Sequence, residues 1–120
     1  MQKKTVVLSA SQNEERYSNM AVKKLLAHKH PVTAIGNKEG IINDIKIIKD
    51  NPFIGEVDTV TLYLNPENQK PYYDYILSLN PKRIIFNPGT ENEELEKIAN
   101  EKGIKTMEAC TLVLLSTKQY

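Results

Sequence analysis

Short apolar segments rich in β-branched residues recur along this 120-residue chain, and helix-forming segments separate them. The first of these segments, at residues 5–8, lacks polar alternation, so it predicts a central strand that is covered on both faces. Further strands are expected at residues 32–35, 57–64, 83–86 and 104–107. Strands that return about every 25 to 30 residues, with a helix between them, are typical of a parallel sheet with right-handed crossovers. The sequence therefore predicts an α/β fold, a Rossmann-like three-layer sandwich with a mainly parallel sheet flanked by helices.

Capping and breaking residues predict where the helices lie. Ser18 is a suitable N-cap for the first helix, and Pro31 follows the end of that helix. Proline at position 71 is tolerated near a helix start, so a helix is expected at residues 71–79. Thr90, followed by glutamate at position 93, has the spacing of a capping box, and Gly103 ends the helix that it opens.

Two segments are left open by these patterns. Residues 40–50 hold five isoleucines, which suit a short strand plus irregular structure, and residues 110–115 fit a helix or a strand equally. We find no internal repeat, low-complexity tract or linker between the elements. The expected organisation is one domain over residues 1–120.

The charge balance and hydropathy argue against several classes of partner. Sixteen basic residues against fifteen acidic residues leave a net charge of +1, so no overall field attracts nucleic acid or an anionic membrane. No apolar stretch approaches the roughly 20 residues of a membrane span, and the N-terminal segment lacks the apolar core of a signal peptide. We therefore expect a cytoplasmic protein that binds neither nucleic acid nor membranes.

No residue cluster with the spacing of a metal or catalytic site emerges. The single cysteine, Cys110, excludes an internal disulfide and a cysteine-rich zinc site, and free cysteines are usually buried. His28 and His30 are two positions apart and face different directions on a helix. No metal site is expected, and a binding module is favoured over an enzyme.

The loop after the first strand carries the strongest ligand signal. In open parallel sheets, ligands bind beyond the carboxyl ends of the strands. The small residues at positions 9–11 allow close approach of the backbone, and the helix start at Ser18 offers free N–H groups to a phosphate. Arg16 is positioned to bind that phosphate with its guanidinium group. A polar loop with an N-cap serine and a solvated arginine is the alternative.

This loop does not match the usual dinucleotide fingerprint. No G-x-G-x-x-G lies between Leu8 and Ser18, and the first glycine of the chain is Gly36. Asn37 and Lys38 follow the second strand, where an acid would bind a nicotinamide ribose. Lysine suits a phosphorylated ribose better, although an exposed turn lysine is an ordinary alternative.

The order of these segments resembles the small stand-alone CoA-binding proteins. These are Rossmann-like domains related to the CoA-binding module of succinyl-CoA synthetase and of NDP-forming acyl-CoA synthetases. LSAS at residues 8–11 with ERYS at residues 15–18 is similar to the family's "GAS…R-x-S" loop. The family's "N-P-K", "V-D-x-V", glycine turn and late cysteine correspond to GNK at 36–38, VDTV at 57–60, NPG at 87–89 and Cys110.

The resemblance implies CoA or acyl-CoA bound on the carboxyl edge of the sheet. It would place the phosphates against Ser9, Ala10, Ser11, Arg16 and Ser18, the adenosine near Gly36, Asn37 and Lys38, and the remaining edge at Asn65, Asn87, Pro88 and Gly89. Ser9 stands where the family usually has glycine, so a positive φ there would be strained.

These observations predict a non-catalytic nucleotide-cofactor-binding protein whose partner is a small molecule. Two alternatives remain open. One is an NAD(P)-binding, oxidoreductase-like domain in which Lys38 reads a ribose phosphate. The other is a ligand-free interaction or regulatory domain.

Overall fold

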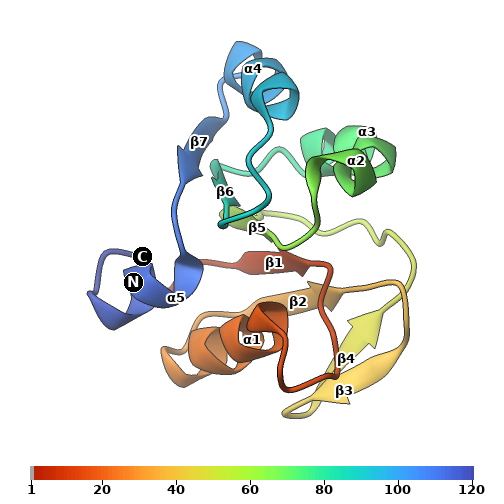
Figure 1. Cartoon of the computed structure of the whole chain (residues 1–120), viewed down its shortest axis with the longest axis vertical. Coiled ribbons are helices and arrows are strands. Elements are labelled where there is room, and N and C mark those ends of the chain that lie inside the picture. Colours follow the sequence, from red (N-terminus) through yellow and green to blue (C-terminus); the bar gives the residue numbers. More distant parts are fainter. Residues whose placement is uncertain (1) are drawn as a thin grey trace.

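The computed structural model describes residues 2–120 and contains one seven-stranded sheet with helices on both faces (Figure 1). The strand order is β3-β4-β2-β1-β5-β6-β7, and all neighbours are parallel except β3 and β4. The strands are β1 (Thr5–Leu8), β2 (Val32–Ile35), β3 (Gly40–Ile42), β4 (Ile45–Ile48), β5 (Thr59–Leu62), β6 (Arg83–Phe86) and β7 (Lys105–Glu108). The helices are α1 (Tyr17–Ala27), α2 (Pro66–Gln69), the 3₁₀ turn η1 (Lys70–Tyr72), α3 (Tyr73–Ser78), α4 (Glu93–Glu101) and α5 (Thr111–Ser116).

The sheet separates two hydrophobic clusters, each buried between one face of the sheet and the helices that cover it. Adjacent residues of β1 point to opposite faces, so Val6 lies in one cluster and Val7 in the other. Val6 packs with Ile76 of α3 and Leu95 of α4, whereas Val7 packs on the face covered by α1 and α5. Each fully buried aliphatic side chain contributes about 1.5–3 kcal/mol to folding. The predicted α/β class, with a mainly parallel sheet between helix layers, is confirmed.

The register of the central strands makes their carboxyl ends finish level. Leu8, the last residue of β1, pairs with Ile35 of β2 on one side and with Leu62 of β5 on the other. Leu62 in turn pairs with Phe86, the last residue of β6. The chain leaves β1 toward β2 and later returns to its other side as β5, so the strand order reverses at β1. The loops that follow β1, β2, β5 and β6 therefore converge at one edge.

The segment 40–50 forms a β-hairpin, where the sequence predicted one short strand with irregular structure. Strands β3 and β4 pair in antiparallel register, with Ile42 opposite Ile45. Asn43 and Asp44 connect them with φ values of 45° and 70°. Positive φ at both central residues is the geometry of a two-residue hairpin turn, and Asn and Asp tolerate it best after glycine. The tail 110–115, which was open between helix and strand, is helical in α5.

Two predicted helix caps are wrong. Helix α1 begins at Tyr17 with Arg16 as N-cap, so Ser18 lies inside the first turn, where it is buried. Helix α4 is capped by Asn92, whose Oδ1 accepts the N–H of Leu95 at 3.2 Å. The Thr90 hydroxyl instead donates to the carbonyl oxygen of Asn87 at 2.7 Å. The helix therefore begins two residues later than the capping-box pattern predicts, with Asn92 as its N-cap in place of Thr90.

The helix expected at residues 71–79 is also different in extent. Helical structure starts earlier, at Pro66, because Asn65 caps α2 by accepting the N–H of Asn68 at 2.9 Å. The helical segment consists of three short pieces, α2, η1 and α3, and Pro71 lies inside the 3₁₀ turn η1. The strand expected at 57–64 is confined to β5, four residues long.

Candidate functional site

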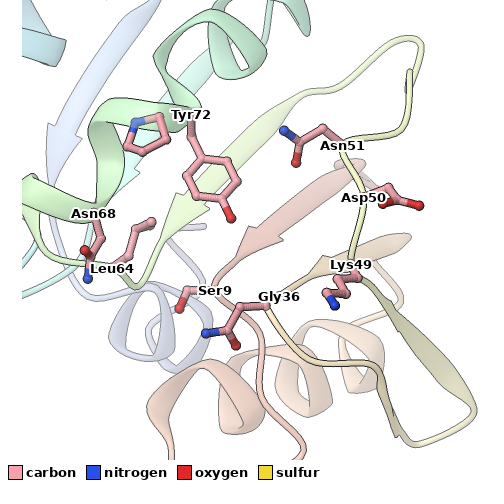
Figure 2. A pocket seen from close by; sticks show the side chains of 10 residues that line it. Ser9, Gly36, Lys49, Asp50, Asn51, Leu64, Asn68 and Tyr72 are labelled. Carbon is pink, nitrogen blue, oxygen red and sulfur yellow. The ribbon is translucent and has the colours of Figure 1, made fainter.

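Two adjoining cavities form a groove at the carboxyl edge of the sheet. The larger, about 640 Å³, is lined by Ser9, Gly36, Asn37, Lys49, Asp50, Asn51, Leu64, Asn68, Pro71 and Tyr72 (Figure 2). The second, about 440 Å³, is lined by Ser9, Ala10, Ser11, Arg16, Tyr17, Ser18, Asn37, Tyr63, Asn68, Pro88 and Thr90. Ser9, Asn37 and Asn68 belong to both linings, so the two spaces meet above the end of β1. This is the position where an open parallel sheet is expected to bind a ligand.

The first loop is held tightly against the end of β2. The backbone N–H groups of Ser9 and Ala10 both donate to the carbonyl oxygen of Ile35, each at 2.8 Å. A β-carbon at Gly36 would lie 2.3 Å from the carbonyl oxygen of Ala10, so only glycine allows this approach. Ser9 has φ of +78°, a left-handed conformation that costs an L-residue roughly 1–2 kcal/mol. The strain considered for Ser9 from the sequence is therefore present.

The amino end of α1 supplies unpaired donors to the smaller of these two cavities. The N-cap Arg16 makes no side-chain capping bond, and within residues 2–120 the N–H groups of Tyr17 and Ser18 have no acceptor. Arg16 is exposed at the cavity wall. The Nδ2 group of Asn19 donates to the carbonyl oxygen of Ser11 at 3.0 Å and joins the loop to the helix. Free amides at the positive end of a helix dipole, beside a guanidinium, suit a phosphate.

The buried side chain of Asn87 holds the segments after β5 and β6 together with hydrogen bonds. Its side chain is 2% exposed, and its Nδ2 donates to Thr61 Oγ1 at 2.6 Å and to the carbonyl oxygen of Leu62 at 2.9 Å. Its Oδ1 accepts the N–H of Thr111 at 2.8 Å, and the hydroxyls of Thr61 and Thr111 are 2.8 Å apart. One amide thereby joins the ends of β5 and β6 to the start of α5.

A third cavity of about 250 Å³ extends the groove toward α5. Its lining consists of Tyr17, Tyr63, Asn87, Pro88, Cys110 and Leu112, and it shares Tyr17, Tyr63 and Pro88 with the 440 Å³ cavity. The Tyr63 hydroxyl is buried and has no hydrogen-bond partner in the described chain. Burial raises the pKa of Tyr63 to about 12, and the neighbouring Thr111 and Thr61 hydroxyls offset only part of that effect. The phenol is therefore a neutral donor at physiological pH.

Most of the residues that the sequence analysis selected lie along this groove. Those in the linings of the three cavities are Ser9, Ala10, Ser11, Arg16, Ser18, Gly36, Asn37, Asn87 and Pro88. Three selected residues lie outside these linings. Lys38 is exposed beyond Asn37, Asn65 is occupied as the cap of α2, and Gly89 sits in a turn with φ of +92°.

Sequence reasoning did not select several lining residues. Lys49 follows β4, a strand that was not predicted separately, and Asn68 lies in α2, which begins earlier than expected. Tyr63 directly follows β5, but the strand was expected to run to residue 64, so the sequence placed Tyr63 inside the strand and not at the carboxyl edge. Tyr72 packs against the hydrophobic core and also lines the larger cavity (Figure 2).

The fold and the groove define the class: a Rossmann-like α/β domain with a groove at the switch point of its sheet. The chain belongs to the CoA binding domain family, whose family model matches residues 3–116. The resemblance noted in the sequence is thereby confirmed, and the expected partner is a small-molecule nucleotide. A search of curated proteins finds no match. Within residues 2–120, no helix has the length and apolar character needed to cross a membrane.

Solved structures show the same architecture. One, described as an uncharacterized protein, is 50% identical, superposes with a TM-score of 0.98, and is matched over 100% of this chain and 99% of its own. A hypothetical protein from Pyrococcus horikoshii OT3 is 24% identical with a TM-score of 0.87, over 97% of this chain and 83% of that chain. Cell-free ID.343 from Thermus thermophilus is 18% identical with a TM-score of 0.86, over 99% of this chain and 91% of that chain. The last two show the fold alone.

Proposed function

We propose that the protein binds CoA or acyl-CoA in the groove at the carboxyl edge of its sheet, as a non-catalytic binding protein. The observation that carries the proposal is the continuity of three cavities, of about 640, 440 and 250 Å³, through shared lining residues. CoA is an elongated molecule with a nucleotide, a central diphosphate and a pantetheine arm. The groove has the same order: its middle is rich in hydrogen-bond donors for the diphosphate, and its two ends can take the nucleotide and the pantetheine arm.

The donors in the middle of the groove suit the diphosphate. The free N–H groups of Tyr17 and Ser18 and the guanidinium of Arg16 offer directional and charged hydrogen bonds to phosphate oxygens. The hydroxyls of Ser9 and Ser11 line the same cavity. Gly36 keeps the first loop close to β2, so these donors are positioned before a ligand arrives.

The two ends of the groove differ in chemistry, which orients the ligand. The larger cavity contains Asn37 and Lys49, an amide and a cation that suit an adenosine carrying a ribose phosphate. In this assignment Lys49 takes the role that the sequence analysis gave to Lys38. The smallest cavity is lined in part by Pro88 and Leu112 and by the neutral Tyr63 phenol, which suits the pantetheine end. We assign no bond-breaking step to any residue of the groove.

Calorimetric titration with CoA tests the proposal. We expect saturable binding to the wild-type protein and at least about tenfold weaker binding to Arg16→Ala, the scale of a lost hydrogen bond to a charged group. Lys97→Ala, which removes an exposed cation from α4, is the matched control and should leave CoA affinity unchanged. Dephospho-CoA should bind wild type and Lys49→Ala equally, because the ribose phosphate is absent.

Three results would count against the proposal. CoA affinity unchanged in Arg16→Ala would remove the arginine from the site. Thermal stabilisation by NADPH and not by CoA would favour the oxidoreductase-like alternative, and no shift with any nucleotide would favour the ligand-free alternative.

A further inference from the structure

A fourth cavity, with strongly basic walls, lies at the opposite, amino edge of the sheet. It measures about 390 Å³ and is lined by Lys3, Asp58, Lys82, Arg83, Lys105, Thr106 and Met107. These residues precede or begin β1, β5, β6 and β7, so none of them belongs to the groove at the carboxyl edge. Four bases against one acid give this lining a net charge of +3, whereas the whole chain carries +1. Positive charge is therefore concentrated here.

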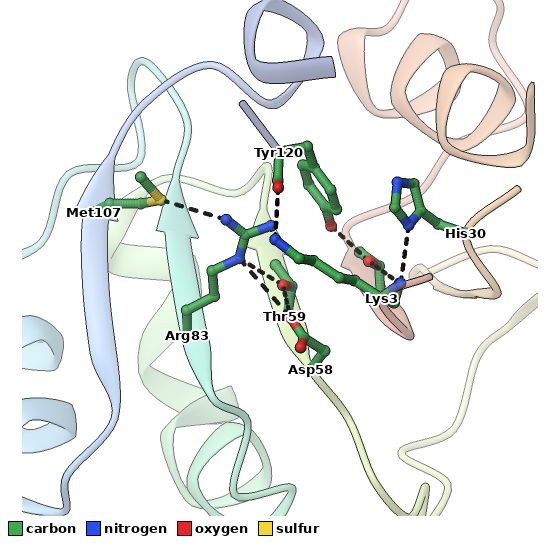
Figure 3. A network of polar contacts seen from close by, with 8 residues as sticks. Lys3, His30, Asp58, Thr59, Arg83, Met107 and Tyr120 are labelled. Carbon is green, nitrogen blue, oxygen red and sulfur yellow. Dashed lines mark hydrogen bonds and ion pairs between the residues drawn. The ribbon is translucent and has the colours of Figure 1, made fainter. Parts of the chain in front are cut away.

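Arg83 is the buried member of this cluster, and its charge is poorly matched. Its side chain is 15% exposed, and Asp58 Oδ1, with which it forms an ion pair, is 4.0 Å from Nε. Nε donates to Thr59 Oγ1 at 2.7 Å and Nη1 to the sulfur of Met107 at 3.9 Å (Figure 3). Nη2 is buried without a hydrogen-bond partner in the described chain. A guanidinium withdrawn from water normally requires closer anionic partners than these.

Arg83 also contacts an aromatic ring. The guanidinium carbon lies 4.4 Å from the centre of the Tyr120 ring, a cation–π contact. The Tyr120 hydroxyl is hydrogen-bonded to Thr5 Oγ1 at 2.5 Å. The ring offsets part of the desolvation of Arg83 and leaves its charge available to a ligand in the cavity.

Lys3 adds a second cation beside the arginine. Its Nζ donates to the main-chain oxygen of Tyr120 at 2.5 Å and lies next to the guanidinium (Figure 3). Burial, together with the charge of Arg83, lowers the pKa of Lys3, whereas Asp58 raises it. Two cations held side by side repel each other, and an anion placed between or beside them relieves that repulsion. Lys82 and Lys105 are exposed and are the other two basic residues of the cavity lining.

We propose that this amino-edge cavity is a second ligand site, which binds a compact phosphate oxyanion carrying two or more negative charges. Lys82 and Lys105 contact the anion at the mouth, and Arg83 with Lys3 provides the charge behind it. Arginine and lysine together are the usual partners of phosphate oxygens in proteins. The site is independent of the carboxyl-edge groove, so a phosphate-bearing small molecule can occupy it while the groove holds its own ligand.

Amide NMR on the ¹⁵N-labelled full chain, titrated with inorganic pyrophosphate at constant ionic strength, tests this site. We expect saturable shifts at residues 82–83 and 105–107, and about tenfold weaker binding in Lys82→Gln/Lys105→Gln. The control Lys97→Gln/Lys102→Gln removes the same charge from exposed positions on and just after α4 and should change nothing at the amino edge. Both cavity lysines are exposed, so the double variant should keep the wild-type fold, which the same spectra report.

The titration separates this proposal from the CoA proposal. Pyrophosphate is also expected to shift amides at residues 9–18, and Arg16→Ala should abolish those shifts while leaving the amino-edge shifts intact. Non-saturable shifts at the amino edge, or equal weakening in the control pair, would overturn the second site. Citrate binding there as tightly as pyrophosphate would overturn the phosphate assignment in favour of polyanions in general.

Discussion

Replacing Asn87 with alanine should destabilise the fold more than any exposed asparagine does. The buried amide makes three hydrogen bonds, at 2.6, 2.9 and 2.8 Å, and alanine would leave the N–H of Thr111 without its acceptor. At about 1 kcal/mol for each bond, the expected loss is about 3 kcal/mol of unfolding free energy. With a urea m-value of about 2 kcal/mol/M, the unfolding midpoint should fall by about 1.5 M.

Urea unfolding followed by far-UV circular dichroism measures this loss directly. Asn100→Ala is the matched control, because Asn100 is exposed on α4 and makes one long hydrogen bond, to Thr106 at 3.3 Å. Its unfolding free energy should change by less than the roughly 0.5 kcal/mol typical of surface substitutions. If the midpoints of both variants coincide with that of wild type, the Asn87 network contributes nothing measurable and our reasoning about this wall is wrong.

Three further predictions concern the first loop and the amino edge. Ser9→Gly should raise the urea midpoint slightly, by about 0.5 kcal/mol in stability, because relief of the strain at φ +78° exceeds the added chain entropy of glycine; a lower midpoint would contradict this. Gly36→Ala should cost about 2 kcal/mol, because its β-carbon would lie 2.3 Å from a carbonyl oxygen of the first loop, whereas Gly55→Ala, with open space around it, should be nearly neutral. His30 accepts the N–H of Lys3 at Nδ1, and burial followed by nearby positive charge lowers its pKa below 6.5. Since the folded state disfavours the proton, stability should be full above pH 6.5 and decline as the pH falls below it, and His30→Gln should flatten that decline measured by thermal melting at stepped pH.

The central strands could be predicted because each contains a run of consecutive apolar residues, which indicates burial on both faces of the sheet. Residues 5–8 and 83–86 were expected as strands and are strands, since runs of β-branched and aliphatic side chains have few other stable arrangements. The hairpin at Gly40–Ile42 and Ile45–Ile48 was not resolved in advance. It lies at the edge of the sheet, its residues are unevenly buried, and its pairing depends on a turn of two residues with positive φ.

Local capping rules located helices better than they located helix starts. Thr90 has the correct spacing for a capping box, yet its hydroxyl is bound to Asn87 while Asn92 caps α4. Ser18 likewise lies inside the first turn of the helix that it was expected to cap. A side-chain hydroxyl bonds to whichever acceptor the folded chain brings nearest, and that acceptor is not visible in the local sequence.

The amino-acid sequence alone determined the sheet class, the family and the loop that carries Ser9, Arg16 and the start of α1, because these features depend on neighbours in the chain. Tertiary structure decided that Tyr63, Asn68 and Lys49 complete the groove, since the strand order brings the segments after β4 and β5 to one edge. It also decided that Lys3, Arg83 and Tyr120 meet at the other edge. The physical reason is that periodicity reports which side of an element is buried, whereas strand order and register determine which distant side chains come together there.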